Sequence, residues 1–131
     1  MPSSNAQRIG TIAEYKFIVA CLERDFEPHL SITPMPWDCL LACPAGDLRV
    51  QVKSTSFRKG QSYNVVTSSG CTGKSELSSD VDVVACYVSP EDTWWMIPRE
   101  ELTSKTIKLN PEPDSKSKYK KYQDNWSIYY K

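Results

Sequence analysis

The sequence has no long apolar run and only one histidine, His29. No segment approaches the roughly 18 consecutive apolar residues that a membrane-spanning helix requires, so we expect no membrane partner. The first ten residues are polar and lack the apolar core of a secretory signal. These absences predict a soluble, cytoplasmic protein.

Cysteine is present in an odd number, five. Cys21, Cys39, Cys43 and Cys86 lie in apolar segments, where a thiol behaves as a small hydrophobe, whereas Cys71 does not. Disulfides are therefore not expected. Structural zinc usually takes four Cys or His ligands in close pairs, and this chain has one near pair, Cys39 and Cys43, which argues against such a site.

The net charge is zero, because sixteen acidic residues balance sixteen basic ones. Composition therefore gives no sign of a polyanionic partner. The charges are unevenly placed: residues 104–131 hold seven Lys against three acidic residues, a local charge of +4 that leaves −4 for residues 1–103. The chain of 131 residues suits one domain, 1–131, with an acidic part and a basic flank.

An amphipathic helix is predicted over residues 5–25. Its apolar side chains recur at three- and four-residue spacing: Ile9, Ile12, Ala13, Phe17, Ala20 and Cys21. Ser4 and Gln7 suit a capping box at its start, and Pro28 follows its end. Glu14 lies at the margin of the apolar stripe, so we expect its carboxylate to point along the core.

Short runs of β-branched and aromatic residues follow, bounded by Pro, Gly, Ser and Asp. They predict strands at 29–33, 37–43, 48–55, 62–67, 81–88 and 93–97. We expect a hairpin turn at 44–47, a short helix at 98–102, a last strand at 106–109 and a second amphipathic helix at 116–126.

Two intervals carry no such pattern. Residues 68–79 are rich in Ser, Gly and Thr and predict a flexible loop, and residues 111–117 predict an extended linker. The order of helix, strands and helix indicates an α/β fold with a mixed central β-sheet flanked by helices.

Four polar residues stand out against this pattern. Asp38 begins an apolar strand, and Gln51 and Lys53 lie two apart on the next strand, so their side chains share one face. A hairpin between the strands lets Asp38 lie across from that face. Glu14 can reach the same edge from the flanking helix.

Such a set suits hydrolysis of a phosphodiester bond, in which a divalent ion offsets phosphate charge and activates water. Magnesium prefers oxygen ligands. Asp38 offers an anionic oxygen, Gln51 a neutral one, and the Val52 carbonyl another. Lys53 can orient or help deprotonate the water and bear part of the transition-state charge.

The pattern Gly10-x-x-Ala13-Glu14, then Asp38, then Gln51-x-Lys53 resembles the PD-(D/E)XK nuclease superfamily, in the variant with glutamine at the acidic position of the last motif. Segments 80–88, 94–98 and 118–126 resemble later segments of the same family, so the likeness covers most of the chain. It is nearest to group I intron-associated homing endonucleases and their small phage or bacterial relatives. Holliday-junction resolvases of the archaeal type share the helix Glu and the strand residues.

This resemblance implies a restriction-endonuclease-like core and a metal site of Glu14, Asp38, Gln51 and Val52 that holds Mg²⁺, with Mn²⁺ able to substitute. It implies a DNA substrate, duplex or branched, in a bacterial, archaeal or phage-infected cell. Because cutting both strands with one small site generally needs two copies, we expect a homodimer or homotetramer. The sequence departs from the family by placing Trp37 between Pro36 and Asp38, and Gln51 lowers the negative charge of the site.

Simpler interpretations remain open for each residue. Glu14 could form a salt bridge on the helix surface, and Asp38 could cap a turn before its strand. Gln51 and Lys53 could lie on the solvent-exposed face of a hairpin. The whole chain also suits a Holliday-junction resolvase, or a DNA-binding or assembly module that kept the fold and lost activity.

Candidate phosphate contacts follow the site strand or flank the next loops: Ser54, Thr55, Arg58, Lys59 and Lys74. Each also suits a solvated turn or the end of a strand. Trp94 and Trp95 are adjacent on a strand, so we expect one to face the core and the other to face outward, where packing is favoured over stacking on a base.

Overall fold

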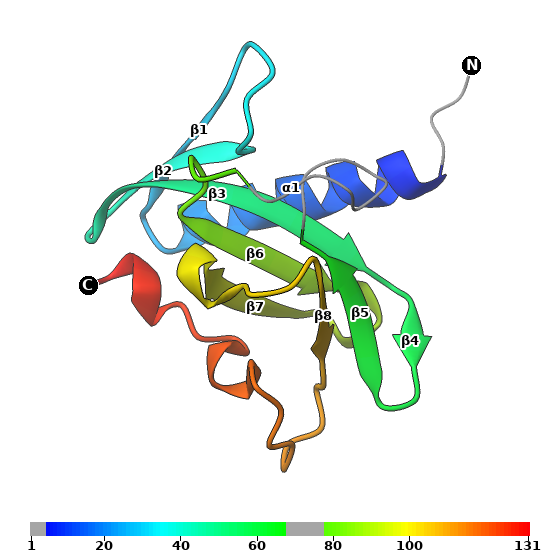
Figure 1. Ribbon diagram of the computed structural model, residues 1–131. Helices are drawn as coiled ribbons and strands as arrows, with labels where there is room; N and C mark the ends of the chain where they lie inside the picture. The colour runs from blue at the N-terminus through cyan, green and yellow to red at the C-terminus, as the bar shows by residue number, and fades with distance from the viewer. Residues whose placement is uncertain (1–4, 68–77) are drawn as a thin grey trace.

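The computed structural model describes residues 5–67 and 78–131, which form one α-helix, eight strands and four short 3₁₀ turns (Figure 1). The helix is α1 (Asn5–Glu23). The strands are β1 (Glu27–Leu30), β2 (Cys39–Cys43), β3 (Gly46–Thr55), β4 (Arg58–Lys59), β5 (Ser62–Val66), β6 (Val83–Val88), β7 (Thr93–Pro98) and β8 (Thr106–Leu109). The 3₁₀ turns are η1 (Ser89–Glu91), η2 (Arg99–Glu101), η3 (Lys120–Tyr122) and η4 (Ser127–Tyr129).

The main sheet has the strand order β1-β2-β3-β6-β7 and is mixed. Its β3 and β6 run parallel, with Val50 opposite Val83 and Lys53 opposite Cys86, whereas its other neighbours are antiparallel. A second sheet, β4-β5-β8, is antiparallel throughout. The mixed α/β sheet that the sequence predicts is therefore present.

Two apolar clusters lie on the two faces of the main sheet. The first joins α1 to the sheet through Ala13, Phe17 and Cys21, and the C-terminal Trp126 and Tyr129 complete it. The second lies between the main sheet and β5 and β8 of the small sheet. Because both faces are covered, every residue of β6 is buried, as expected for a strand inside a two-sided core.

Trp94 and Trp95 show the same two-sided cover. They alternate on β7, with Trp94 in the first cluster and Trp95 in the second, and both are buried. The expectation that one would face outward is wrong. The small sheet and Tyr119 cover the second face of the main sheet, and they bury Trp95 there.

The predicted helix face is correct except at Ile12. Ala13, Phe17 and Cys21 are buried, whereas Ile12 is 48% exposed. The helix ends where Asp25 takes a left-handed φ of 63°, and the Phe26 amide then donates to the Cys21 carbonyl at 2.9 Å. Among the described residues, no helix has the length and apolar character to cross a membrane.

The predicted strands are confirmed, with ends that coincide or differ by up to three residues. The turn at residues 44–45 leads into Gly46, whose φ of 114° suits glycine. The short helix expected at 98–102 is the 3₁₀ turn η2, and β8 matches its prediction. Residues 111–117 carry no helix or strand, as predicted, and most of the loop predicted at 68–79 lies outside the described residues.

The second helix predicted over 116–126 is wrong. The chain there forms η3, after which Gln123 is extended and Asp124 takes a left-handed φ of 50° that no α-helix contains. The Asp124 amide donates to the Trp94 carbonyl, and its carboxylate accepts hydrogen bonds from the Trp94 amide and the Thr93 hydroxyl. These bonds to β7 replace the i to i−4 bonds of a helix.

The cysteines behave as small apolar groups. Cys21, Cys39, Cys43 and Cys86 are free thiols, three of them buried, and Cys71 lies outside the described residues. Burial raises the pKa of Cys39 to about 11, so this thiol stays protonated at neutral pH. The absence of disulfides is confirmed for the four described cysteines.

Phe17 provides a test of the first cluster. Its ring contacts Trp94, Trp126 and Tyr129 and has no exposed surface. We expect Phe17→Ala to lower the free energy of unfolding by about 3–5 kcal/mol, measured by urea denaturation, because it leaves a cavity. Phe57→Ala, at a 65% exposed position, is the matched control and should change it by less than about 0.5 kcal/mol. Equal losses would contradict this arrangement of the core.

Candidate active site at the open edge of β3

The strand β3 is longer than its neighbour β2 and extends beyond it. Part of the β3 edge therefore has no strand beside it. The last pair between them is Cys39 with Val50. The Asp38 amide donates to the Val50 carbonyl at 2.9 Å, and the Val52 amide then donates to Asp38 Oδ2 at 2.8 Å. A carboxylate therefore takes the place of the next backbone partner, and the strand pairing ends there.

The same hydrogen bond orients the backbone of Val52. On an extended strand the N–H and C=O of one residue point to the same side. Because the Val52 N–H points to Asp38, its carbonyl also faces the open edge. Asp38 and the Val52 carbonyl, predicted separately from the sequence, thus lie on one edge of the sheet.

Glu14 reaches this edge from α1. It follows the buried Ala13 and is itself half-buried, and its carboxyl is hydrogen-bonded to the Asp38 carboxylate. Burial, followed by the charge and hydrogen bond of Asp38, raises the pKa of Glu14 to about 7. Two carboxyl groups held so close favour either a shared proton or a bound cation.

The side chains of Gln51 and Lys53 lie on the face of the sheet that α1 does not cover. Val50 and Val52 pack in the first cluster with α1, and side chains alternate along a strand. The ammonium of Lys53 lies near enough to Cys86, in the second cluster, to offset part of the rise in that thiol's pKa that burial causes. Gln51 and Lys53 therefore share a face, as predicted, and this face is opposite the one that α1 and Glu14 cover.

The amide oxygen of Gln51 has no hydrogen-bond partner among the described residues although it is buried. A buried oxygen without a partner is costly unless a ligand or water satisfies it. Within residues 5–67 and 78–131 no three His, Cys, Asp or Glu side chains gather around one point. A cation here would therefore combine the two carboxylates with neutral oxygens, and an all-oxygen set suits Mg²⁺ or Mn²⁺.

A hollow of about 310 Å³ opens beside the carboxylate pair. Glu14, Asp38 and Val52 line it together with apolar residues such as Leu30, Met35 and Trp37. The hollow gives the pair access to solvent and leaves space for an ion with its waters.

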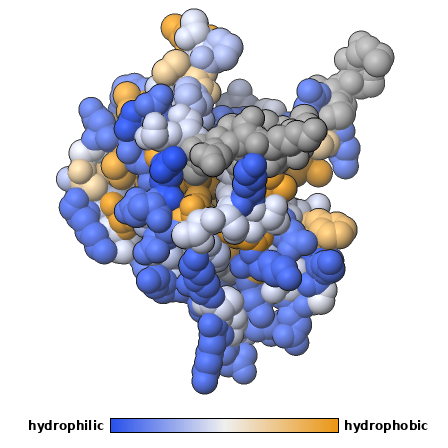
Figure 2. All heavy atoms as spheres, in the orientation of Figure 1, coloured by the Kyte–Doolittle hydropathy of each residue, from blue (hydrophilic) through white to orange (hydrophobic). Residues whose placement is uncertain are grey.

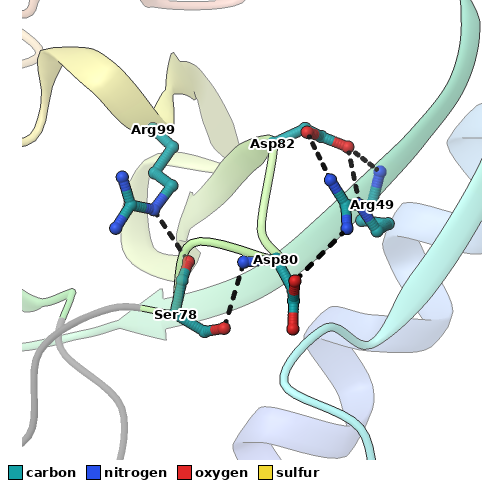
Figure 3. Close-up of polar contacts among 5 residues, drawn as sticks. All are labelled: Arg49, Ser78, Asp80, Asp82 and Arg99. Carbon is teal, nitrogen blue, oxygen red and sulfur yellow. Dashed lines mark hydrogen bonds and ion pairs between the residues drawn. The ribbon is translucent and has the colours of Figure 1, made fainter.

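Arg49 ties the site strand to the segment that precedes β6 (Figure 3). Its backbone amide and its Nε donate to Asp82 Oδ2 at 2.8 and 3.1 Å, and its Nη2 donates to Oδ1 at 3.2 Å. Asp80 lies 3.6 Å from Nη1. Although burial opposes it, the hydrogen bonds and charge of Arg49 hold the pKa of Asp82 below its usual value.

This connection was not predicted from the sequence. Arg49 and Asp82 are 33 positions apart, and neither carries a recognisable spacing relative to the other. The available signal was indirect: Arg49 lies on a strand two residues before Gln51, and Asp82 immediately precedes a fully apolar strand. The pair fixes the start of the parallel β3 and β6 pairing, two residues from Gln51.

The residues predicted to contact phosphate differ in their exposure to solvent. Arg58 and Lys59 are exposed on β4, on a face of the molecule where hydrophilic side chains predominate (Figure 2), and Arg58 Nη2 lies 3.7 Å from Glu112 Oε1. Ser54 is half-buried on β3. Thr55 is buried, and its hydroxyl donates to the Asn64 carbonyl and accepts from the Phe57 amide, so we leave it out of the proposed DNA surface. Lys74 lies outside the described residues.

Comparisons with known proteins identify a family and a similar solved structure. A family model described as PD-(D/E)XK endonuclease matches residues 4–129. Among solved structures, the chain is similar to a bacterial homing endonuclease, I-Ssp6803I, with a TM-score of 0.79, 20% identity and coverage of 99% of this chain and 93% of that one. This likeness confirms the predicted α/β core. A search of curated proteins found no match.

The raised pKa of Glu14 predicts how stability depends on pH. In the unfolded chain this group loses its proton near its ordinary value of 4.5, whereas in the folded chain it keeps the proton up to about pH 7. The folded state therefore binds more protons in this window and loses stability as the pH rises through it. We expect Glu14→Gln to raise the melting temperature in EDTA at pH 8, and to raise it less at pH 5.

Glu27→Gln, at an exposed position on β1, is the control and should leave both melting temperatures close to those of the unsubstituted chain. A Glu14→Gln chain that melts below the unsubstituted one at pH 8 would show that the Glu14 charge stabilises the fold instead.

Proposed function

This chain belongs to the PD-(D/E)XK endonuclease family, and from that premise we propose that it is a Mg²⁺-dependent endonuclease that hydrolyses phosphodiester bonds in DNA. The observation that supports this proposal best is the Glu14 and Asp38 pair at the open edge of β3. The unpartnered oxygen of Gln51 on the same strand adds to it. A purely structural carboxylate pair would need neither the open edge nor the hollow beside it.

In this proposal Asp38 is the central ligand. Its Oδ2 is held by the Val52 amide, which orients the carboxylate along the edge of the sheet. Glu14 adds a second carboxylate from α1, and Gln51 adds a neutral amide oxygen. The Val52 carbonyl is the fourth oxygen ligand. When bound, the divalent ion supplies positive charge that offsets the phosphate and the charge developing on the leaving oxygen.

Lys53 has a different role in this proposal. It shares a strand face with Gln51, and its ammonium can hold the attacking water in line and stabilise negative charge in the transition state. Arg49 and Asp82 act as positioning residues, because they hold β3 against β6 close to Gln51. Ser54, Arg58, Lys59 and Lys74 remain candidates for contact with the DNA backbone.

The substrate we favour is duplex DNA cut at specific sites, as expected for a homing or phage-type endonuclease. I-Ssp6803I, a similar solved structure, is a homing endonuclease. Two copies would supply one active site for each strand, so we propose a homodimer or homotetramer acting on a target with approximate two-fold symmetry. A Holliday-junction resolvase, which reads branch shape, is the second candidate.

Cleavage assays with Lys53→Met test the proposal. The change keeps most of the side-chain length and removes the charge, so we expect Mg²⁺-dependent cleavage to fall by at least about 100-fold, a loss of the size seen when a group that stabilises charge is removed. DNA binding measured by gel shift in Ca²⁺ should change little. The control, Lys108→Met on the exposed side of β8, should retain activity.

The substrates should include plasmid, linear duplex and a four-way junction, each with Mg²⁺ and with EDTA. Preference for the junction would favour the resolvase. Binding of DNA without any Mg²⁺-dependent cleavage by the unsubstituted chain would instead show an inactive module.

Gln51 offers a test of metal binding itself. We expect Gln51→Glu to lower the Mg²⁺ concentration needed for half-maximal thermal stabilisation by about 10-fold, because it adds an anionic ligand. Gln51→Leu has a similar volume without the oxygen and should raise that concentration. The measurement is a Mg²⁺ titration of the melting temperature at pH 8. An unchanged titration for both variants would remove Gln51 from the proposed ligand set.

A further inference from the structure

A row of large apolar side chains on α1 is left exposed by the fold. Ile12, Tyr15, Val19 and Leu22 have exposed fractions of 48, 61, 54 and 51%. We call these four residues the outer stripe. Their spacing of three, four and three residues puts them on one face of the helix over about 15 Å, as in the a and d positions of a coiled coil.

The outer stripe lies opposite the face that α1 presents to the sheet. At about 100° per residue, Val19 is turned roughly 160–200° from Phe17 and Cys21, which are buried. The helix therefore has two apolar faces, and only one of them packs against the five-stranded sheet (Figure 1). Single exposed apolar residues are ordinary, but a contiguous row along three turns marks an interaction surface.

We propose that the outer stripe of α1 pairs with the outer stripe of a second copy of this chain, antiparallel about a two-fold axis. Four half-exposed large side chains amount to on the order of 400 Å² per copy, within the size range of functional apolar patches. With polar groups at the rim, two such patches reach the lower end of the area buried in stable dimers, about 1,200 Å². A two-fold axis makes the patch its own partner.

The charges beside the outer stripe favour the antiparallel direction. Lys16 and Glu23 are seven residues apart and therefore flank the stripe on the same side. A two-fold axis midway between them, near Val19, sets each Lys16 opposite Glu23 of the other copy. A parallel pair would instead set this flank against the opposite flank of the other helix, where Thr11 and Ile18 offer no charged partner to Lys16.

A groove next to the outer stripe provides space for side chains of the second copy. It has a volume of about 450 Å³ and lies between α1 and the edge formed by Tyr87, Asp92 and Trp94. Lys16 leans over it, with Nζ 5.4 Å from the centre of the Tyr87 ring. Ile12, Tyr15 and Val19 of the outer stripe form one wall of this groove, so side chains of the second copy that enter it would contact the stripe directly.

This inference goes beyond the proposed function, which requires two copies but names no surface. Its test is independent of cleavage because the readout is molecular mass. We expect the full chain at micromolar concentration to sediment as a dimer or as a multiple of one. Val19→Glu should halve that mass, giving monomers from a dimer or dimers from a tetramer, with an unchanged circular dichroism spectrum, because it puts a charge at the centre of the contact.

The matched control is Ile32→Glu, which makes the same kind of change at a fully exposed position outside α1 and should leave the mass unchanged. If the unsubstituted chain is a monomer, or if Val19→Glu sediments like the control, the proposal is overturned. A dimer that still shows no nuclease activity would contradict the proposed function and leave this interface supported.

Exchanging the flanking charges tests the antiparallel direction. Lys16→Glu alone and Glu23→Lys alone each create like-charge contacts across the axis and should weaken association about 10-fold at low salt. The double variant restores opposite charges and should recover the affinity of the unsubstituted chain. Recovery supports the antiparallel pair, and additive losses in the double variant would rule it out.

Discussion

The hydrogen bond from the Val52 amide to the Asp38 carboxylate is the contact on which the candidate site depends. It ends the pairing of β2 with β3 by substituting a side-chain oxygen for a backbone one. An anionic group is thereby held in the plane of a sheet, where Glu14 meets it from the face that α1 covers, whereas the side chains of Gln51 and Lys53 lie on the other face.

Much of this arrangement can be predicted from local sequence, because short-range rules govern it. The helix periodicity places Glu14 beside Ala13 and Phe17, and the alternation on β3 puts Gln51 and Lys53 on one face. The turn before Gly46 sets the hairpin that brings Asp38 near them. Each of these inferences needs only the few residues around it.

The errors concern what covers each element, which local rules do not determine. Ile12 has the spacing of a core residue but lies on the outer face of α1. Trp94 and Trp95 both became buried because the small sheet closes the second face. The aromatic spacing near the C-terminus suggested a helix, yet the bonds of Asp124 to β7 outweigh that preference. In each case a partner distant in the sequence decides the outcome.

The parallel pairing of β3 with β6 has a consequence for the order in which the site assembles. The β2–β3 hairpin closes through a two-residue turn, a local event on the microsecond scale, and with it Asp38 can find the Val52 amide. Pairing of Val50 with Val83 must instead close a loop of more than thirty residues, which is slower. The edge that Asp38 forms with Val52 can therefore form early during folding, whereas the surroundings of Lys53 mature only when β6 joins the sheet.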